Sequence, residues 1–337
     1  WYAEYGNHDT LFYGSFPIDS ALRSLALGSR KPALWPDLAA NYLDGMARQH
    51  SVLTRLEYTL RTQLGTARGF RTVSSDPDRK LFDQAGFMQE HFETEPAPGP
   101  VGHGFTEANL KTGKTYWAAD VTDWLRILGL NTCNQVMGAD GAVPEDQFEW
   151  LKAELEAARD DNKLCMILSH HNSLTLENTA VAVGNSGQRL IHAEEFIDTL
   201  VGYPNLIAWL NGHTHNNTIT AHPAKEGAGG FWEITTASCV DFPQQQPMVE
   251  VVDNADGTLS IFTTTLDHNS PAKWTTNDFS PEGLSALSRE LAANDWSAGP
   301  DLRIGSPLDR NCELLLPAPF DLSRITDRQL QTEQARG

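Results

Sequence analysis

Short apolar runs that end in polar clusters dominate the chain from about residue 115 onward. The runs "TYWAAD", "WLRILGLNT", "KLCMILSHH" and "LIAWLNGHTHNN" have the length and the flanking residues of buried strands. Pro144 to Asn162 repeats apolar residues at three- and four-residue spacing, with Phe148, Leu151 and Leu155 on one face, which predicts an amphipathic helix. A second helix is predicted within "GQRLIHAEEFIDTLVGYPN".

Three further strands are predicted after these, in "GFWEITTAS", "PMVEVVDN" and "GTLSIFTTTLD", and a "DNADG" hairpin turn joins the last two. Strands that alternate with helices, followed by a run of strands, indicate a pair of sheets covered by helices. The sequence therefore predicts an α/β fold in which loops at strand ends carry the functional groups.

The first 114 residues have a different pattern of apolar and polar positions. "WYAEY" reads as a short strand that stops at Gly6–Asp9, and residues 14–114 have little strand character. Helices are predicted at Pro36–Gly65 and Asp76–Phe92, before a loop rich in proline and glycine. The tail after Asn269 is rich in proline, with one helix near "PEGLSALSRELAAND".

Composition narrows the function classes. Lys and Arg number 25 and Asp and Glu 44, which gives a net charge of −19 and argues against a nucleic-acid partner. No stretch approaches the roughly 18 apolar residues of a membrane helix. The four cysteines form no CxxC pair, which predicts free thiols and leaves the compartment open.

Five of the eleven histidines directly follow predicted strands. They are His8, His170, His171, His213 and His215. Imidazole nitrogen is a common ligand of zinc, manganese and iron, so three strands that deliver imidazoles to one sheet edge predict a metal site. The glycine of "GHTH" is expected to let the backbone turn tightly there.

The residues around His8 add two further groups. Asn7 offers an uncharged oxygen ligand, and Asp9 can hold the His8 ring and set its tautomer. His8 is then free for proton transfer beside the metal. His103, flanked by glycines in "GPVGHGF", either reaches into the site or is an exposed loop residue.

"GNHD", "SHH" and "GHTH", in this order and each after a predicted strand, resemble the last three of five motifs of the calcineurin-like metallophosphoesterases. "GFWEITTASCVDFPQQ" is similar to the strand that follows in larger bacterial members. The resemblance implies a four-layer α/β/β/α sandwich over residues 1–268, with a largely helical, cap-like insertion at about 14–114 and a C-terminal extension at 269–337.

The resemblance also implies roles. Asn7 and His213 would bind a second metal ion, His215 a first, and His170 is the ligand of its pair. His8 would be the proton donor, with Asp9 behind it. His171 would be a supporting or substrate-side group, and His103 is added as a substrate contact.

The implied cofactor is a pair of metal ions, Mn, Fe or Zn, and the implied partner is a small phosphoester, monoester or diester. In the family, an Asp-x-His and a Gly-Asp motif precede Gly-Asn-His-Asp, and neither is found in this sequence. We therefore expect a preceding segment to supply the opening strands and half of the metal site. The alternative is a non-catalytic structural or interaction protein that retains the fold.

Overall fold

The computed structural model describes most of the chain outside the middle of the insertion. The described residues are 1–9, 18, 20–32, 70–95, 97–134, 136, 138–181, 187, 189–225, 229–295 and 303–325. The helix predicted at Pro36–Gly65 lies outside them. No helix in the described part is long and apolar enough to cross a lipid bilayer.

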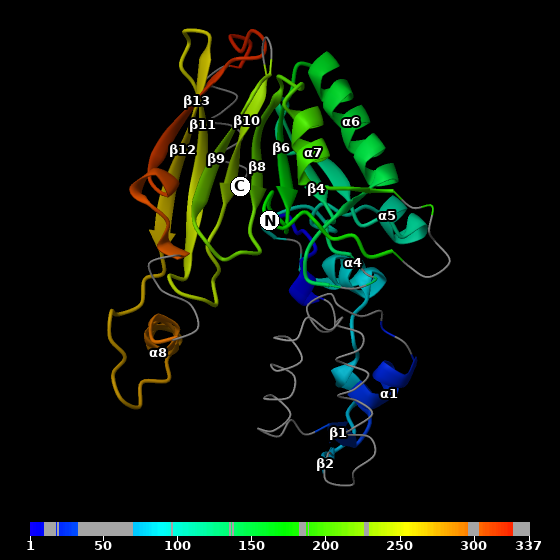
Figure 1. Ribbon diagram of the computed structural model, residues 1–337. Helices are drawn as coiled ribbons and strands as arrows, with labels where there is room; N and C mark the ends of the chain where they lie inside the picture. Colours follow the sequence, from blue (N-terminus) through cyan, green and yellow to red (C-terminus); the bar gives the residue numbers. More distant parts are fainter. Residues whose placement is uncertain are drawn as a thin grey trace.

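A six-stranded mixed sheet forms the centre of the molecule (Figure 1). In spatial order its strands are β3 (Trp117–Asp120), β4 (Leu125–Leu130), β6 (Leu164–Ser169), β8 (Leu206–Asn211), β10 (Gly230–Thr235) and β9 (Thr218–Pro223). The four inner strands are parallel, and the two edge strands are antiparallel to their neighbours. The carboxyl ends of the inner strands therefore meet at one edge of the sheet.

Two helices cover one face of this sheet, α6 (Glu145–Asp160) and α7 (Ala193–Leu200), each preceded by a short strand, β5 (Val143–Pro144) or β7 (Leu190–Ile191). Phe148, Leu151 and Leu155 are buried against the sheet, which confirms the predicted apolar face of α6. The mixed sheet with its helices confirms the α/β class.

A second, antiparallel sheet packs on the other face. It consists of β11 (Gln245–Asp253), β12 (Thr258–Asp267) and β13 (Cys312–Pro317). Ile207 and Ile234 of the central sheet pack with Ile261 and Leu314 of the second. The layers are thus α/β/β, and among the described residues no helix covers the outer face of the second sheet, where the fourth layer was expected. Because β13 comes from the C-terminal extension, the extension completes this sheet.

The strand predicted in "WYAEY" is absent, and this prediction was wrong. The segment pairs with no strand, because a loop and a side chain take up its backbone groups: Ala3 N–H donates to His103 O (2.8 Å), and Trp117 Nε1–H donates to Ala3 O (2.9 Å). The Trp117 ring lies so close over Gly129 of β4 that a Cβ there would be 2.3 Å away. The segment ends in a short 3₁₀ turn, η1 (Asn7–Asp9).

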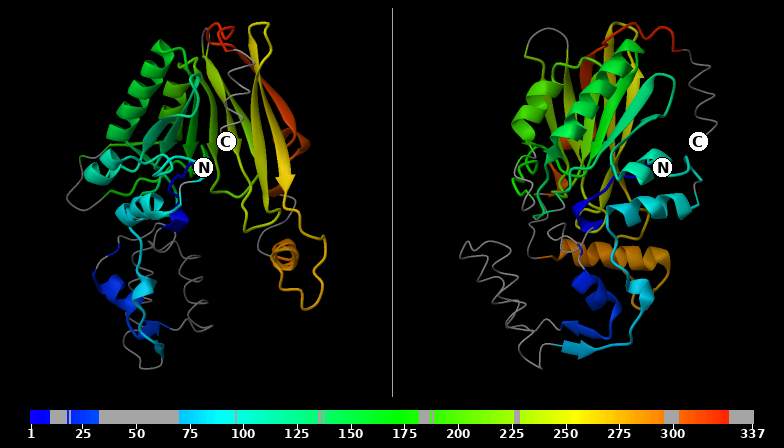
Figure 2. Two further views of the ribbon diagram at one scale, coloured as in Figure 1. Left: turned by 180° about the vertical axis from the view of Figure 1, so that it is seen from behind. Right: turned by 90° about the vertical axis from the view of Figure 1, so that its right-hand side faces the viewer.

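The insertion packs on this N-terminal segment through α4 (Gln84–Glu93) and α5 (Glu107–Thr112), around Met88, Phe105 and Trp117. The helix predicted at Asp76–Phe92 begins later, because the Asp83 side chain caps α4 by accepting from Gly86 N–H. The other described elements of the insertion lie beyond the sheet edge (Figures 1 and 2): α1 (Ser20–Leu27), β1 (Arg30–Pro32), β2 (Phe70–Thr72) and η2 (Pro77–Arg79).

The C-terminal extension also reaches this edge. Its helix α8 (Pro281–Ala293) lies beyond the end of the second sheet, on the opposite side from α1 (Figure 1). A short turn, η3 (Pro307–Asp309), leads into β13. All four cysteines are free thiols, as the sequence predicted.

Candidate metal centre

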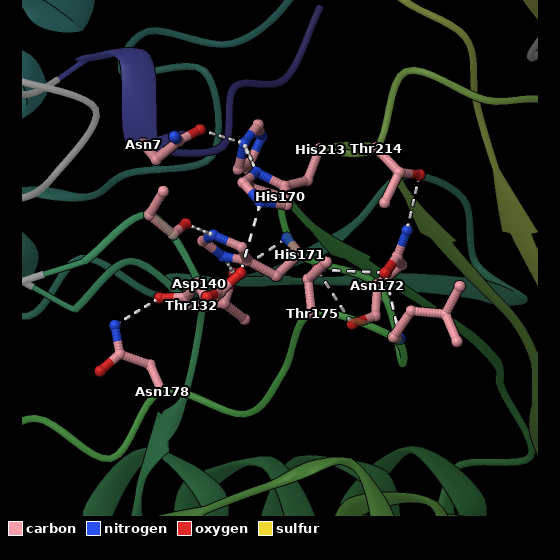
Figure 3. A network of polar contacts seen from close by, with 12 residues as sticks. Asn7, Thr132, Asp140, His170, His171, Asn172, Thr175, Asn178, His213 and Thr214 are labelled. Carbon is pink, nitrogen blue, oxygen red and sulfur yellow. Dashed lines mark hydrogen bonds and ion pairs between the residues drawn. The ribbon is translucent and has the colours of Figure 1, made fainter. Parts of the chain in front are cut away.

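Three side chains from distant parts of the chain meet at the carboxyl edge of the central sheet (Figure 3). Asn7 belongs to η1, His170 follows β6, and His213 follows β8. His170 Nε2 lies 2.6 Å from Asn7 Oδ1 and 3.1 Å from His213 Nδ1. The parallel pairing of β6 with β8 brings the two histidine loops side by side.

This donor set fits a metal ion. One ring nitrogen from each of His170, His171 and His213 lies within 4.8 Å of the others, but both nitrogens of His171 have partners inside the protein, which leaves His170 and His213 as ligands. Two nitrogens bound to one tetrahedral zinc ion at about 2.0–2.1 Å are separated by roughly 3.3 Å. The 3.1 Å between His170 and His213 is close to that spacing, and Asn7 Oδ1 adds an oxygen donor on the same side.

Burial keeps these imidazoles in the neutral form that binds metal. Burial, together with the charges of neighbouring histidines, lowers the pKa of His170 to about 2, and the same causes lower that of His213 to about 4. The pKa of His171 falls to about 3, also mainly through burial. At pH 7 all three rings therefore carry a nitrogen lone pair.

Two glycines make room for the histidine rings. A Cβ on Gly6 would lie 3.0 Å from His170 Nδ1, and a Cβ on Gly141 would lie 2.4 Å from His171 Cγ. Gly141 is therefore required by a ring thirty residues further along the chain. Sequence reasoning missed it, because nothing in the linear pattern connects the two positions.

His171 supports the site from behind and does not reach solvent. Its side chain is fully buried, with Nδ1 2.8 Å from Thr132 Oγ1 and Nε2 2.7 Å from Ala139 O. Nε2–H donates to this carbonyl, which leaves Nδ1 to accept from the Thr132 hydroxyl. The arrangement fits a supporting role and does not fit a substrate contact, because both ring nitrogens are already engaged inside the protein.

Asp140 is a further acidic group at the cluster that sequence reasoning missed. Its Oδ1 lies 4.0 Å from His213 Nε2, while Nδ1 of the same ring faces His170 (Figure 3). The Asp140 side chain is half-exposed. A carboxylate at this place adds negative charge beside a cation site.

The "GHTH" turn does not use its glycine as expected. The residues with left-handed backbone conformation are His213 (φ 66°) and His215 (φ 59°), whereas Gly212 has no positive φ. A side chain in this region carries a steric cost of about 1–2 kcal/mol, which the loop's other contacts must offset. The strain thus lies in the two histidines themselves.

His215 is two residues from His213 but is not among the histidines whose ring nitrogens group together, and a different partner holds it. Its Nδ1 is 2.5 Å from Asp241 Oδ2, which leaves Nε2 for a metal ion.

His8 is exposed in η1, directly after the buried Asn7. Asp9 closes the turn, because its Oδ2 accepts from Gly6 N–H at 2.9 Å. Loss of hydration raises the pKa of Asp9, while this N–H and the nearby His91 and His8 lower it. The carboxylate therefore shapes the loop that presents Asn7 and His8.

His103 lies in the packing of the N-terminal segment, and the expected substrate contact is not seen there. The side chain is fully buried, its ring stacks on Trp1 with 3.2 Å between ring centroids, and Nδ1 lies 3.0 Å from Trp1 O. The flanking glycines, Gly102 and Gly104, leave space for Phe92 and Trp117. They thus serve packing and give the imidazole no path to the cluster.

A buried carboxylate, Glu233 of β10, ties the two histidine loops together. Its Oε1 accepts from Ser173 N–H (2.8 Å) and Asn211 Nδ2–H (2.9 Å), and its Oε2 lies 2.8 Å from His222 Nε2. Burial raises the pKa of Glu233, but the hydrogen bonds from His222, Ser173 and Asn211 outweigh it and hold the pKa below its usual value. The sequence gives no sign of this role, because Glu233 lies inside an apolar strand.

Comparison with known proteins yields one sequence match. Over 109 residues the chain is 32% identical to the cyclic GMP-AMP phosphodiesterase SMPDL3A of Bos taurus. The match is to a phosphoester hydrolase. It covers 31% of this chain and 23% of the relative, so the chain spans about a quarter of that protein's length.

The other comparisons add little. No protein-family model matches the chain. Among solved structures, a dimetal phosphatase from Danio rerio is similar over 46% of this chain and 59% of its own, with a TM-score of 0.32 and 12% sequence identity. A similarity this low carries no argument about fold or function. The sequence match alone supports the resemblance seen in the motifs.

Proposed function

We propose that this chain is part of a metal-dependent hydrolase of phosphomonoesters or phosphodiesters. The observation that carries the proposal is the meeting of Asn7, His170 and His213 from three loops, with donor atoms 2.6 and 3.1 Å apart. The match to a phosphodiesterase supports the same reaction class. The ligand types suit Mn, Fe and Zn alike.

The proposal assigns the side chains of the cluster to two metal ions. Asn7, His170 and His213 would hold one ion, and Nε2 of His215 would be the ligand of a second. When bound, such ions lower the pKa of a water molecule and neutralise charge on a phosphoryl oxygen. Asp140, beside His213, adds negative charge that favours the bound cation.

His8 is the proposed proton donor to the leaving oxygen. It is exposed, beside Asn7 and outside the trio of donor atoms, so it can meet a substrate without being a ligand. Asp9 positions it by closing the η1 turn through Gly6. A positioned general acid accelerates such a reaction by roughly 10²–10⁴-fold.

The test compares His8→Ala with His213→Ala in the full-length protein. His8→Ala should retain bound metal but lose roughly 10²–10⁴-fold in turnover. The loss should be smaller for nitrophenyl esters, whose acidic leaving groups have less need of a proton. His213→Ala should lose metal, because it removes a ligand. Bound metal is measured by elemental analysis. Turnover rates are measured on two esters whose leaving groups differ in pKa.

His192→Ala is the matched control, since this ring lies at the start of α7 and bonds Asn178 O (3.0 Å) outside the cluster. Loss of metal in His8→Ala, or equal slowing on both esters, would contradict the proposed proton donor. A wild-type protein that binds no metal and cleaves no ester would favour the alternative, a non-catalytic protein that retains the fold.

The proposal extends to the insertion at about 14–114, which would act as a cap that selects substrate. Its support is the position of α1, β1 and β2 beyond the edge that carries the histidines (Figure 1). Deleting the outer part of the insertion, residues 20–72, keeps α4 and α5, which pack on the N-terminal segment. This deletion should change the ratio of rates between small and bulky esters more than it changes metal content. Unchanged rate ratios on deletion would refute the cap.

A further inference from the structure

A carboxylate links the "GHTH" turn to the C-terminal extension. Asp241, in the loop after β10, lies between His215 and Arg303. Its Oδ2 is 2.5 Å from His215 Nδ1 and 2.6 Å from Arg303 Nη1, so one oxygen accepts from both groups. Between 22% and 33% of each of the three side chains is exposed, so all are shielded in part from solvent.

The backbone around Arg303 is bonded to the same turn. Asn217 N–H donates to Arg303 O at 3.0 Å, and Asn217 Nδ2–H donates to Ile304 O at 3.3 Å. Two residues further, Ile219 N–H donates to Asp309 Oδ1 at 2.9 Å. These bonds fix the segment 303–309 along the start of β9, which explains how Arg303 reaches Asp241.

The turn needs such support because His215 has a left-handed backbone. Its φ is 59°, a conformation that costs a residue with a Cβ about 1–2 kcal/mol. A strained conformation persists only when its surroundings specify it. For His215 the ring is held through Asp241, and the backbone two residues on is held through Asn217.

We propose that Asp241 and Arg303 are positioning residues, which hold His215 as the Nδ1–H tautomer with Nε2 toward the metal centre. The inference rests on the proposed function for the metal and on geometry for the tautomer. Asp241 accepts from Nδ1–H, so the lone pair stays on Nε2. Arg303 donates to the same carboxylate oxygen and fixes its direction. The C-terminal extension then contributes to the metal site, because it supplies Arg303.

Four variants test this in the full-length protein. Asp241→Asn offers an amide that can donate to Nδ1, and should shift His215 toward the Nε2–H tautomer. Arg303→Met removes the donor that fixes Asp241, and Arg303→Lys restores a cation there. Arg310→Met is the matched control, because Arg310 directly follows this segment but donates from Nε to Ser306 O, at 3.4 Å.

Three quantities are measured for each variant: the imidazole ¹⁵N shifts of His215 in metal-free protein, Mn²⁺ and Zn²⁺ affinity by chelator competition, and the urea midpoint. Loss of a partner that orients a metal-binding histidine typically lowers metal affinity about 10–100-fold. We expect this loss in Asp241→Asn and Arg303→Met, recovery in Arg303→Lys, and wild-type affinity in Arg310→Met.

The outcomes separate this inference from the proposed function. If Asp241→Asn and Arg303→Met change the urea midpoint but leave the ¹⁵N shifts and metal affinity of wild type, the pair only anchors the extension and the inference is wrong. If the wild type shows the Nδ1–H tautomer, lost in Asp241→Asn, but cleaves no phosphoester, the positioning role stands and the proposed function fails.

Discussion

Removing the buried carboxylate of Glu233 should destabilise the protein and loosen the metal centre together. Only 2% of its side chain is exposed, and that of His222 is 11% exposed. A buried donor left without its acceptor costs about 1–3 kcal/mol, and Glu233→Ala removes the partner of His222 Nε2. Glu233→Ala also leaves Ser173 N–H and Asn211 Nδ2–H without their acceptor.

Glu233→Gln separates the two halves of this network. Both bonds to the histidine loops end on Oε1, whereas only His222 contacts Oε2. An amide with its oxygen in the Oε1 position keeps the loop bonds and loses only the charge toward His222. The expected cost is therefore about 1.5–3 kcal/mol, as for one hydrogen bond to a charged group.

The assay is urea unfolding together with metal content. Glu250→Ala, an exposed glutamate of β11, is the control and should change stability by no more than about 0.5 kcal/mol. Glu233→Ala should bind metal more weakly, because both loops lose a bond, and Glu233→Gln should bind like wild type. If Glu233→Gln is as unstable as Glu233→Ala, or if Glu233→Ala behaves like Glu250→Ala, the reasoning fails.

Two further predictions concern the stability of the metal-free protein at low pH and the effect of a Cβ added at Gly141. Because burial lowers the pKa values of His170, His171 and His213 to about 2, 3 and 4, the unfolded chain takes up protons first as the pH falls below 6.5. Metal-free protein should then lose up to about 1.4 kcal/mol per pH unit for each ring, measured by urea unfolding from pH 7 to 5; a flat profile would count against their burial. Gly141→Ala should displace the His171 ring, cost about 1–3 kcal/mol by overpacking and lower metal content, whereas Gly187→Ala, whose Cβ meets nothing within 4 Å, should do neither.

The contribution of Glu233 to stability changes over a lower pH range than that of the histidines. Its pKa is held below the ordinary 4.5, so its contribution to stability is present at neutral pH and is lost as the pH falls through that lowered value. The difference in unfolding free energy between wild type and Glu233→Gln should thus be constant from pH 7 to about 5 and shrink below about 4.5. A difference that grows in acid would contradict the pairing.

The sequence predicted best what depends on local pattern. The inner strands and α6 were found because continuous apolar runs and a helical repeat are readable from neighbouring residues alone. Strand β13 (Cys312–Pro317) was missed, since it lies at a sheet edge and has a short, mixed pattern. The "WYAEY" segment has the composition of a strand, but a strand also needs a neighbour, and here Trp117 and the His103 loop take that place.

The site residues also fall into two groups: those that local pattern reveals and those that it does not. Asn7, His170 and His213 could be singled out because each stands at the end of an apolar run. Parallel pairing brings His170 and His213 together, whereas the segment of Asn7 pairs with no strand and is held by the His103 loop and Trp117. Asp241 and Glu233 could not, because their importance comes from which loops they join. Contacts between distant segments leave no mark in the periodicity of either one.

The long chain separation between the donor atoms has a consequence for folding kinetics. Asn7 and His170 are 163 residues apart, and His170 and His213 are 43 apart. Closing loops of this length costs entropy before any contact is gained, and parallel sheets form slowly for that reason. The three donors therefore come together only late, when the sheet has assembled. A bound metal ion should mainly slow unfolding and leave the folding rate almost unchanged, because its ligands are not together until the sheet has formed.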